Sequence, residues 1–142
     1  MKTNLSRTLS VAGEHGLYHF VAQARGGAVA ERLSDKKRTV FDVRKRITSL
    51  ADIAIYTSEG ELKLKEVFLA LQKVLGDKEA PAPKADEKEF RDLFGAAVPN
   101  YDGDRFYLSH MRKVCEWYNE LVKYASLDFE EEEQEEVDEE EK

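Results

Sequence analysis

The sequence predicts an α+β protein: a small SH3-like or Sm-like β-barrel with a covering helix, then a helix–turn–helix pair and a disordered acidic tail. Three observations carry this prediction. The first part of the chain alternates apolar residues between tight turns, as short strands do. Three later segments repeat apolar residues at helical spacing. The final segment, residues 128–142, is almost entirely acidic.

Four segments are expected to be strands, because each is short, has apolar residues on at least one face and is bounded by turn residues. They are residues 16–24, 28–33, 38–43 and 51–57. We expect tight turns at Arg25-Gly26-Gly27, where glycine takes positive φ at little cost, and from Ser34 to Lys37. Several short strands this close together are typical of a small curled barrel.

A helix is predicted to follow the strands. Residues 61–76 carry apolar residues at helical spacing and end in Gly76, a frequent helix stop. We expect this helix to lie across the open side of the barrel, so that the first domain spans residues 1–76. Residues 77–85, DKEAPAPKA, interleave proline and alanine and are predicted to form an extended linker.

The second unit, residues 86–127, is predicted to contain two helices and the turn between them. Asp86 and Glu89 have the spacing of a capping box at the start of the first helix, and Ser109 is a suitable N-cap for the second. Residues 128–142 carry 11 acidic residues against one lysine. Such a segment has too little apolar surface to fold and is predicted to be disordered.

The composition excludes several functional classes. The single cysteine, Cys115, rules out an internal disulfide and any CxxC site, and we expect it to pack on a helix. No segment has the length and apolarity of a signal peptide or a membrane span, so we expect a cytoplasmic protein without a membrane partner. The histidines lack metal-site spacing, and no hydrolase, dinucleotide or phosphate-loop motif occurs. We therefore expect no cofactor and no enzymatic activity.

A basic segment is the main candidate binding surface. On a small barrel, a cationic loop beside exposed aromatic residues is a usual surface for RNA or DNA. Residues 1–79 carry 14 Lys and Arg against 10 Asp and Glu, a net charge of only +4, which is modest for such a function. The alternative is a solvated hairpin whose charges prevent edge-to-edge aggregation. The candidate residues are Lys36, Lys37, Arg38, Phe41, Arg44, Lys45 and Arg46.

The stretch that begins at Asn100 resembles the first half of a calcium-binding EF-hand loop. Asn100, Asp102 and Asp104 occupy ligand positions 1, 3 and 5. Position 6 is Arg105 instead of glycine, and position 12 is Met111 instead of the bidentate glutamate. We therefore expect a turn between helices in which the two aspartates cap backbone amides. A metal-regulated binding module that uses these weak ligands is the alternative.

The acidic tail permits three interpretations. It can keep the protein soluble, hold a basic partner, or fold back on the basic segment of its own chain as a nucleic-acid mimic. The residues alone leave these three open.

Three further stretches, written with x for any residue, are SxxGxxGLY from Ser10, SLxDIxIYT from Ser49 and PNYDxDRxYxSxxxKVxxWYN from Pro99. Together they resemble an uncharacterised protein family of the Bacteroidetes bacteria, over nearly the whole chain. The resemblance implies a cytoplasmic protein with a small β-domain and a helical C-terminal unit, and it implies no activity and no catalytic residues.

These observations predict a non-catalytic interaction or adaptor protein. We expect a protein or nucleoprotein partner, in the translation or transcription machinery, with RNA or DNA as an alternative partner.

Overall fold

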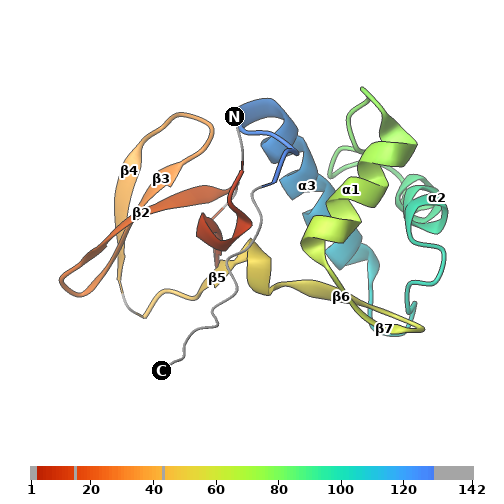
Figure 1. The fold of residues 1–142 in the computed structure, drawn as a ribbon, viewed down its shortest axis with the longest axis horizontal. Coiled ribbons are helices and arrows are strands. Elements are labelled where there is room, and N and C mark those ends of the chain that lie inside the picture. Colours follow the sequence, from red (N-terminus) through yellow and green to blue (C-terminus); the bar gives the residue numbers. More distant parts are fainter. Residues whose placement is uncertain (1–2, 15, 43, 130–142) are drawn as a thin grey trace.

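The computed structural model describes residues 3–14, 16–42 and 44–129, which form a five-stranded sheet, a separate two-stranded hairpin and three α-helices (Figure 1). The strands of the sheet are β1 (Thr8–Val11), β2 (Tyr18–Ala24), β3 (Gly27–Arg32), β4 (Arg38–Asp42) and β5 (Ile47–Ser49). The hairpin consists of β6 (Ala54–Thr57) and β7 (Gly60–Lys63). The helices are α1 (Leu64–Leu75), α2 (Glu87–Ala97) and α3 (Leu108–Tyr124), with short 3₁₀ turns η1 (Leu5–Arg7) and η2 (Leu50–Asp52). The predicted α+β class is confirmed, and none of the described helices is long and apolar enough to cross a membrane.

The five-stranded sheet is antiparallel in the order β4-β3-β2-β1-β5 and is open. Its edge strands, β4 and β5, do not pair with each other among the described residues. The closed SH3-like or Sm-like barrel predicted from the sequence is therefore not found. That prediction rested on the number of strands and the spacing of turns, which do not determine whether two edges come within pairing distance.

The sheet is nevertheless strongly curled. The Lys45 N–H donates to the Asp42 carbonyl at 2.9 Å, closing a tight turn after β4, and β5 begins at Ile47. A turn followed by two residues spans at most about 14 Å. The outer strands of a flat five-stranded sheet lie about 19 Å apart, so this connection is too short to join β4 to β5 unless the sheet curls. A β-bulge in β2, between Phe20 and Ala22, adds local twist.

The curled sheet encloses a small core of its own. Five buried side chains form it: Leu9, Val11, Tyr18, Ala30 and Phe41. The rings of Tyr18 on β2 and Phe41 on β4 meet edge to face, with centroids 5.0 Å apart. Since β3 lies between these two strands, the contact requires β2 and β4 to turn toward one another.

Both predicted turns of the sheet are confirmed. The β2–β3 hairpin turns at Arg25 and Gly26, and Gly26 has a φ of 81°. The β3–β4 connection closes with hydrogen bonds between Arg32 and the residues Lys36 and Lys37. Lys36 has a φ of 63° and is the only non-glycine residue with a positive φ among those described.

Helix α1 packs against α2 and α3 instead of covering the sheet (Figure 1). Its buried residues Val67, Phe68 and Leu71 share a core with Phe90 of α2 and Tyr118 of α3. The predicted covering helix is therefore wrong in its position. The sheet already fills its curled interior with its own side chains, whereas three amphipathic helices bury their apolar stripes well only against one another.

The helix ends follow the sequence only in part. Helix α1 stops at Gly76, as predicted, with a φ of 61°. Helix α2 begins after Asp86, whose side chain makes no capping bond; its carbonyl accepts from the Glu89 N–H instead. Helix α3 begins at Leu108, one residue before the predicted cap, and the His110 Nδ1 accepts from the Tyr107 N–H at 3.1 Å.

The proline–alanine segment 77–85 is held against α3. The Ala80 N–H donates to the Asn119 Oδ1 at 2.9 Å, and the Asn119 Nδ2 donates back to the Ala80 carbonyl at 3.1 Å. Ala80 is buried in the helical core. This segment therefore continues the packed structure, and the proposed division of the chain at residues 76 and 86 stays a prediction.

The two ends of the described chain meet. The Thr3 N–H donates to the Asp128 carbonyl at 2.8 Å, and the Thr3 hydroxyl donates to the Ser126 carbonyl at 2.7 Å. The Phe129 ring stacks on Phe68 of α1 with centroids 6.1 Å apart. The first two residues of the predicted acidic tail are thus placed beside the N-terminal segment. The remainder, residues 130–142, lies outside the described residues.

A candidate binding groove between β6 and α3

The basic residues predicted to form one surface are divided between the two ends of β4. Lys36, Lys37 and Arg38 lie at its start, and Arg44, Lys45 and Arg46 follow its end. Among the described residues, three of the six are paired with acidic side chains: Arg38 with Glu31 at 3.4 Å, Arg44 with Asp42 at 3.8 Å, and Lys45 with Glu14 at 3.7 Å. The positive charge is therefore spread along the strand and partly compensated.

Phe41, the aromatic residue of the predicted nucleic-acid surface, is buried. Its side chain is only 6% exposed and packs on Tyr18 inside the sheet, while its neighbour Val40 points outward and is 59% exposed. The expectation that Phe41 offers a stacking surface to a base is wrong. Alternation along β4 puts one of these two residues inside, and the larger ring takes that place.

The Asp102-Gly103-Asp104 stretch is a turn that Asp102 organises. The Asp102 Oδ1 accepts from the Asp104 N–H at 2.9 Å, as predicted for a capping aspartate, and the Oδ2 accepts from the Arg105 Nε at 2.9 Å. These two donors, the amide first, lower the pKa of the Asp102 carboxyl. Asn100 contributes its carbonyl to the Ser58 N–H, and Asp104 is exposed. The described residues contain no group of three or more His, Cys, Asp or Glu side chains suited to a metal.

We predict that this turn does not bind calcium with useful affinity. A calcium ion would have to displace Arg105 from Asp102 and would still lack a bidentate carboxylate. Calorimetric titration of the full chain should give no dissociation constant below about 10⁻⁵ M, the weak end of the sensor range. Tighter binding would favour the metal-regulated alternative, with Asn100, Asp102 and Asp104 as its ligands.

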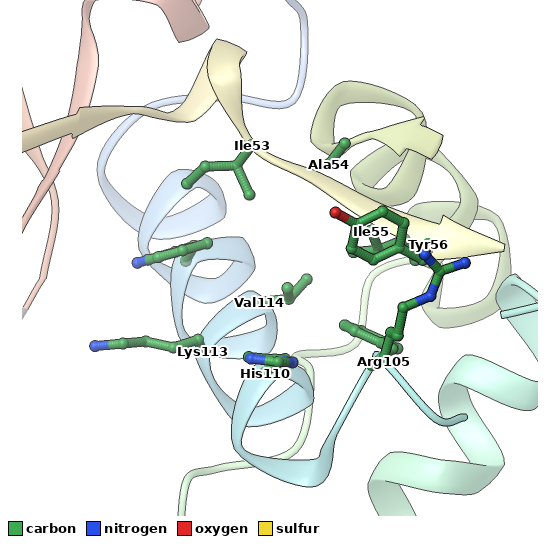
Figure 2. Close-up of a pocket in the computed structure, with 10 residues that line it drawn as sticks. Ile53, Ala54, Ile55, Tyr56, Arg105, His110, Lys113 and Val114 are labelled. Carbon is green, nitrogen blue, oxygen red and sulfur yellow. The ribbon is translucent and has the colours of Figure 1, made fainter. Parts of the chain in front are cut away.

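A groove of about 290 Å³ lies between strand β6 and helix α3 (Figure 2). Apolar side chains line its interior, among them Ile53, which directly precedes β6, and Val114 and Trp117 of α3. In Figure 2, Ile53 and Val114 point toward one another across it. The other lining residues are Ala54, Ile55, Tyr56, Arg105, Phe106, His110 and Lys113.

One wall of the groove is a strand with an unpaired edge. Strand β6 pairs with β7 on one side, with Thr57 opposite Gly60 across a two-residue turn. In such a hairpin the closing pair is hydrogen-bonded, so the main-chain groups of Ala54 and Tyr56 are directed to the other side. The Asp102 N–H reaches the Tyr56 carbonyl from that side, at 2.8 Å. No main chain among the described residues pairs there with Ala54; we call this the outer edge of β6.

Positively charged and hydrogen-bonding side chains surround the groove. The Arg105 guanidinium lies 4.2 Å from the centroid of the Tyr56 ring and pairs with Asp102 at 2.9 Å. His110 and Lys113 project from α3 and are exposed (Figure 2). Because the His110 Nδ1 accepts from the backbone, its Nε2 is left to donate to a ligand. Arg105, His110 and Lys113 are together called the basic rim.

Cys115, on the same helix, is fully buried and faces the helical core, as predicted. Burial raises the pKa of its thiol to about 12. The thiolate is the reactive form of cysteine, so this residue is not a nucleophile at neutral pH.

The groove was not predicted from the sequence. In the sequence, Arg105 stands out only as a misfit in a calcium loop. One signal was available: His110, Lys113, Val114 and Trp117 recur at helical spacing and therefore mark one face of α3 that is partly basic and partly apolar. The spacing could not show that β6, far away in sequence, lies opposite that face.

Comparison with known proteins gives the lineage of the chain. Two families match it: a domain of unknown function (DUF5606) over residues 5–50 and a domain of unknown function (DUF6852) over residues 53–121. A protein from Bacteroides vulgatus, whose solution NMR structure was a structural genomics target, is 31% identical; the match covers 92% of this chain and 99% of that chain, with a TM-score of 0.72. The chain belongs to this two-domain Bacteroidetes family. The resemblance inferred from the sequence is thus confirmed.

The two family matches divide the molecule where η2 connects the sheet to the hairpin. The first match covers the five-stranded sheet, and the second contains β6, β7 and the three helices apart from the end of α3. Every residue that lines the groove falls within the second match. No curated protein is significantly similar to this family member.

Proposed function

We propose that this protein is a non-catalytic adaptor that binds a segment of a protein partner in the groove between β6 and α3. The observation that carries the proposal is the combination, in one groove, of an unpaired strand edge, an apolar interior and a basic rim. Apolar concavities with a few convergent polar groups are the usual form of a binding site. An open strand edge adds main-chain donors and acceptors that an extended chain can satisfy.

A protein partner has more support than RNA or DNA. Binding of single-stranded nucleic acid combines a basic channel with aromatic faces on which bases stack. In this groove Arg105 covers Tyr56, and Trp117 is only 8% exposed. On the sheet Phe41 is buried. We propose that the curled sheet, as an opened variant of an SH3-like barrel, serves as the scaffold that leads through η2 into β6.

Selection of a random peptide library against the immobilised full chain tests this function. We expect enriched peptides without tryptophan to change the fluorescence of Trp117, which is the single tryptophan of the chain and lines the groove. They should also shift the amide NMR signals of Ala54, Tyr56 and Lys113. Failure to enrich any peptide, or shifts confined to β4 and the turn after it, would contradict the proposal.

A further inference from the structure

We infer that the segment bound in this groove is extended and acidic, carries apolar side chains at alternate positions, and adds as a strand to the outer edge of β6. The inference rests on the proposed function and names the class of ligand. It follows from the main-chain geometry of β6, from the lining of the groove and from the charge of its rim.

The main-chain geometry favours strand addition. The chain already uses the outer edge of β6 at one end: Thr57 forms an antiparallel bridge with Tyr101, and the Ser58 and Asp102 amides close it. After Asp102 the chain turns away toward α3. A ligand strand can take over the same edge where this segment leaves it, opposite Ala54, and use donors and acceptors that no described main chain uses.

The lining favours a ligand that alternates in character. Successive side chains of an added strand point to opposite faces, as in any strand. One set would enter the groove and contact Ile53, Val114 and Trp117, which are apolar. The other set would face outward, beside the basic rim. Figure 2 shows His110 and Lys113 on the α3 side of this path and Arg105 near its end at Tyr56.

The rim charge favours carboxylates on the outward set. Arg105 is partly compensated by Asp102, whereas Lys113 and the His110 Nε2, both on α3, make no ion pair or side-chain hydrogen bond with a residue that the structure describes. Exposed ion pairs add little affinity each, but they select the sign of the partner and speed its association. Acidic segments should therefore bind better than basic ones, with a difference that declines as salt is added.

Two other ligands of the groove must be distinguished from a partner protein: the acidic end of this chain and a second copy of it. Residues 130–142 of this chain contain ten acidic residues and Val137, and they begin after Phe129, beside α1. A second copy of the chain could offer its own edge. We assign the groove to a partner protein, because residues 130–142 contain a single apolar residue for an apolar groove, and a second copy would bring its own basic rim against this one.

Synthetic peptides tested against the full chain, with Trp117 fluorescence as the readout, examine the inference. The first peptide alternates glutamate and leucine, and the second replaces each glutamate by lysine. Two further versions carry N-methyl groups on alternate amides, in one register or the other, so that only one of them blocks the amides that face β6. We expect the lysine peptide to bind about ten-fold more weakly or worse. We expect one N-methylated register to lose binding and the other to keep it.

Protein variants supply the matched control. Lys113→Glu should weaken the glutamate peptide several-fold, whereas Lys84→Glu, the same charge change at an exposed position in the segment 77–85, should leave it unchanged. Equal binding by the glutamate and lysine peptides, or equal loss in both N-methyl registers, would overturn the inference. If library peptides bind the groove in that case, the proposed function survives; if they do not, it fails as well.

Two further measurements identify what occupies the groove. A chain that ends at Phe129 should bind the glutamate peptide as the full chain does. Binding about ten-fold tighter or more would overturn the assignment to a partner, because the chain's own acidic segment would then compete for the groove. Dimerisation that the glutamate peptide reverses would overturn it in favour of a second copy.

Discussion

Replacing Phe68 by alanine is expected to lower the free energy of unfolding by about 3–5 kcal/mol, the range for removal of a buried aromatic side chain. Phe68 is fully buried in α1 and lies against Tyr118 of α3 and Phe129, with ring centroids 6.4 and 6.1 Å away. Val67 and Leu71, two other residues of α1 in this core, are themselves fully buried. The loss should appear as a lower urea midpoint, followed by circular dichroism and by Trp117 fluorescence.

Val74→Ala is the matched control for this prediction. It truncates an apolar side chain on the same helix, but Val74 is 45% exposed, so its free energy of unfolding should change by no more than about 0.5 kcal/mol. If Phe68→Ala costs less than about 1 kcal/mol, α1 does not belong to the helical core. The NMR signals that Phe68→Ala shifts should lie in α3 and not in β2 or β3.

Gly27→Ala is expected to destabilise the sheet by roughly 2–3 kcal/mol, the upper part of the range for overpacking. A Cβ on Gly27 would lie 1.8 Å from the carbonyl oxygen of Phe41 and 2.8 Å from its carbonyl carbon. Both atoms belong to the backbone of β4, which cannot move aside without breaking the pairing of Gly27 with Asp42. The displaced Phe41 would then lose its contact with Tyr18.

The same substitution at Gly95 should change the stability in the opposite direction. Gly95 is exposed within α2, and an added Cβ there would meet no atom within 4 Å. Gly95→Ala should therefore stabilise the protein by roughly 0.5–1 kcal/mol, through helix propensity and a smaller loss of chain entropy. Thermal melts of the two variants compare them directly. A Gly27→Ala protein as stable as the wild type would show that β3 and β4 do not approach as closely as described.

Most helices and turns could be predicted from the sequence, because short-range physics determines them. Glycines at positive φ set the turn at Gly26 and the end of α1 at Gly76. Apolar residues at helical spacing located all three helices. The misplaced start of α3 has the same local origin: Ser109 has the better capping side chain, but the His110 imidazole accepts from the Tyr107 amide, two residues before Ser109.

The position of α1 could not be predicted, because its apolar stripe would fit any apolar surface. Phe68 and Leu71 can cover a sheet as well as they cover two helices. The choice depended on how much apolar surface the sheet left open, and therefore on the curl that brings Phe41 onto Tyr18. That contact depends in turn on the pairing of Gly27 with Asp42.

The sequence by itself determined the local elements of this protein, its α+β class and its lineage, since each is written in residue spacing or in motifs that lie within one stretch of chain. The tertiary structure decided which face of each element is inside and which distant elements meet. Val40 and Phe41 are adjacent and both apolar, yet only strand pairing determines that the ring is buried. The groove likewise requires β6 and α3 to lie opposite each other, and the Asp102 turn, which precedes α3, sets the direction of that helix. Long-range contacts of this kind arise from packing, and the spacing of residues along the chain does not reveal which distant elements pack together.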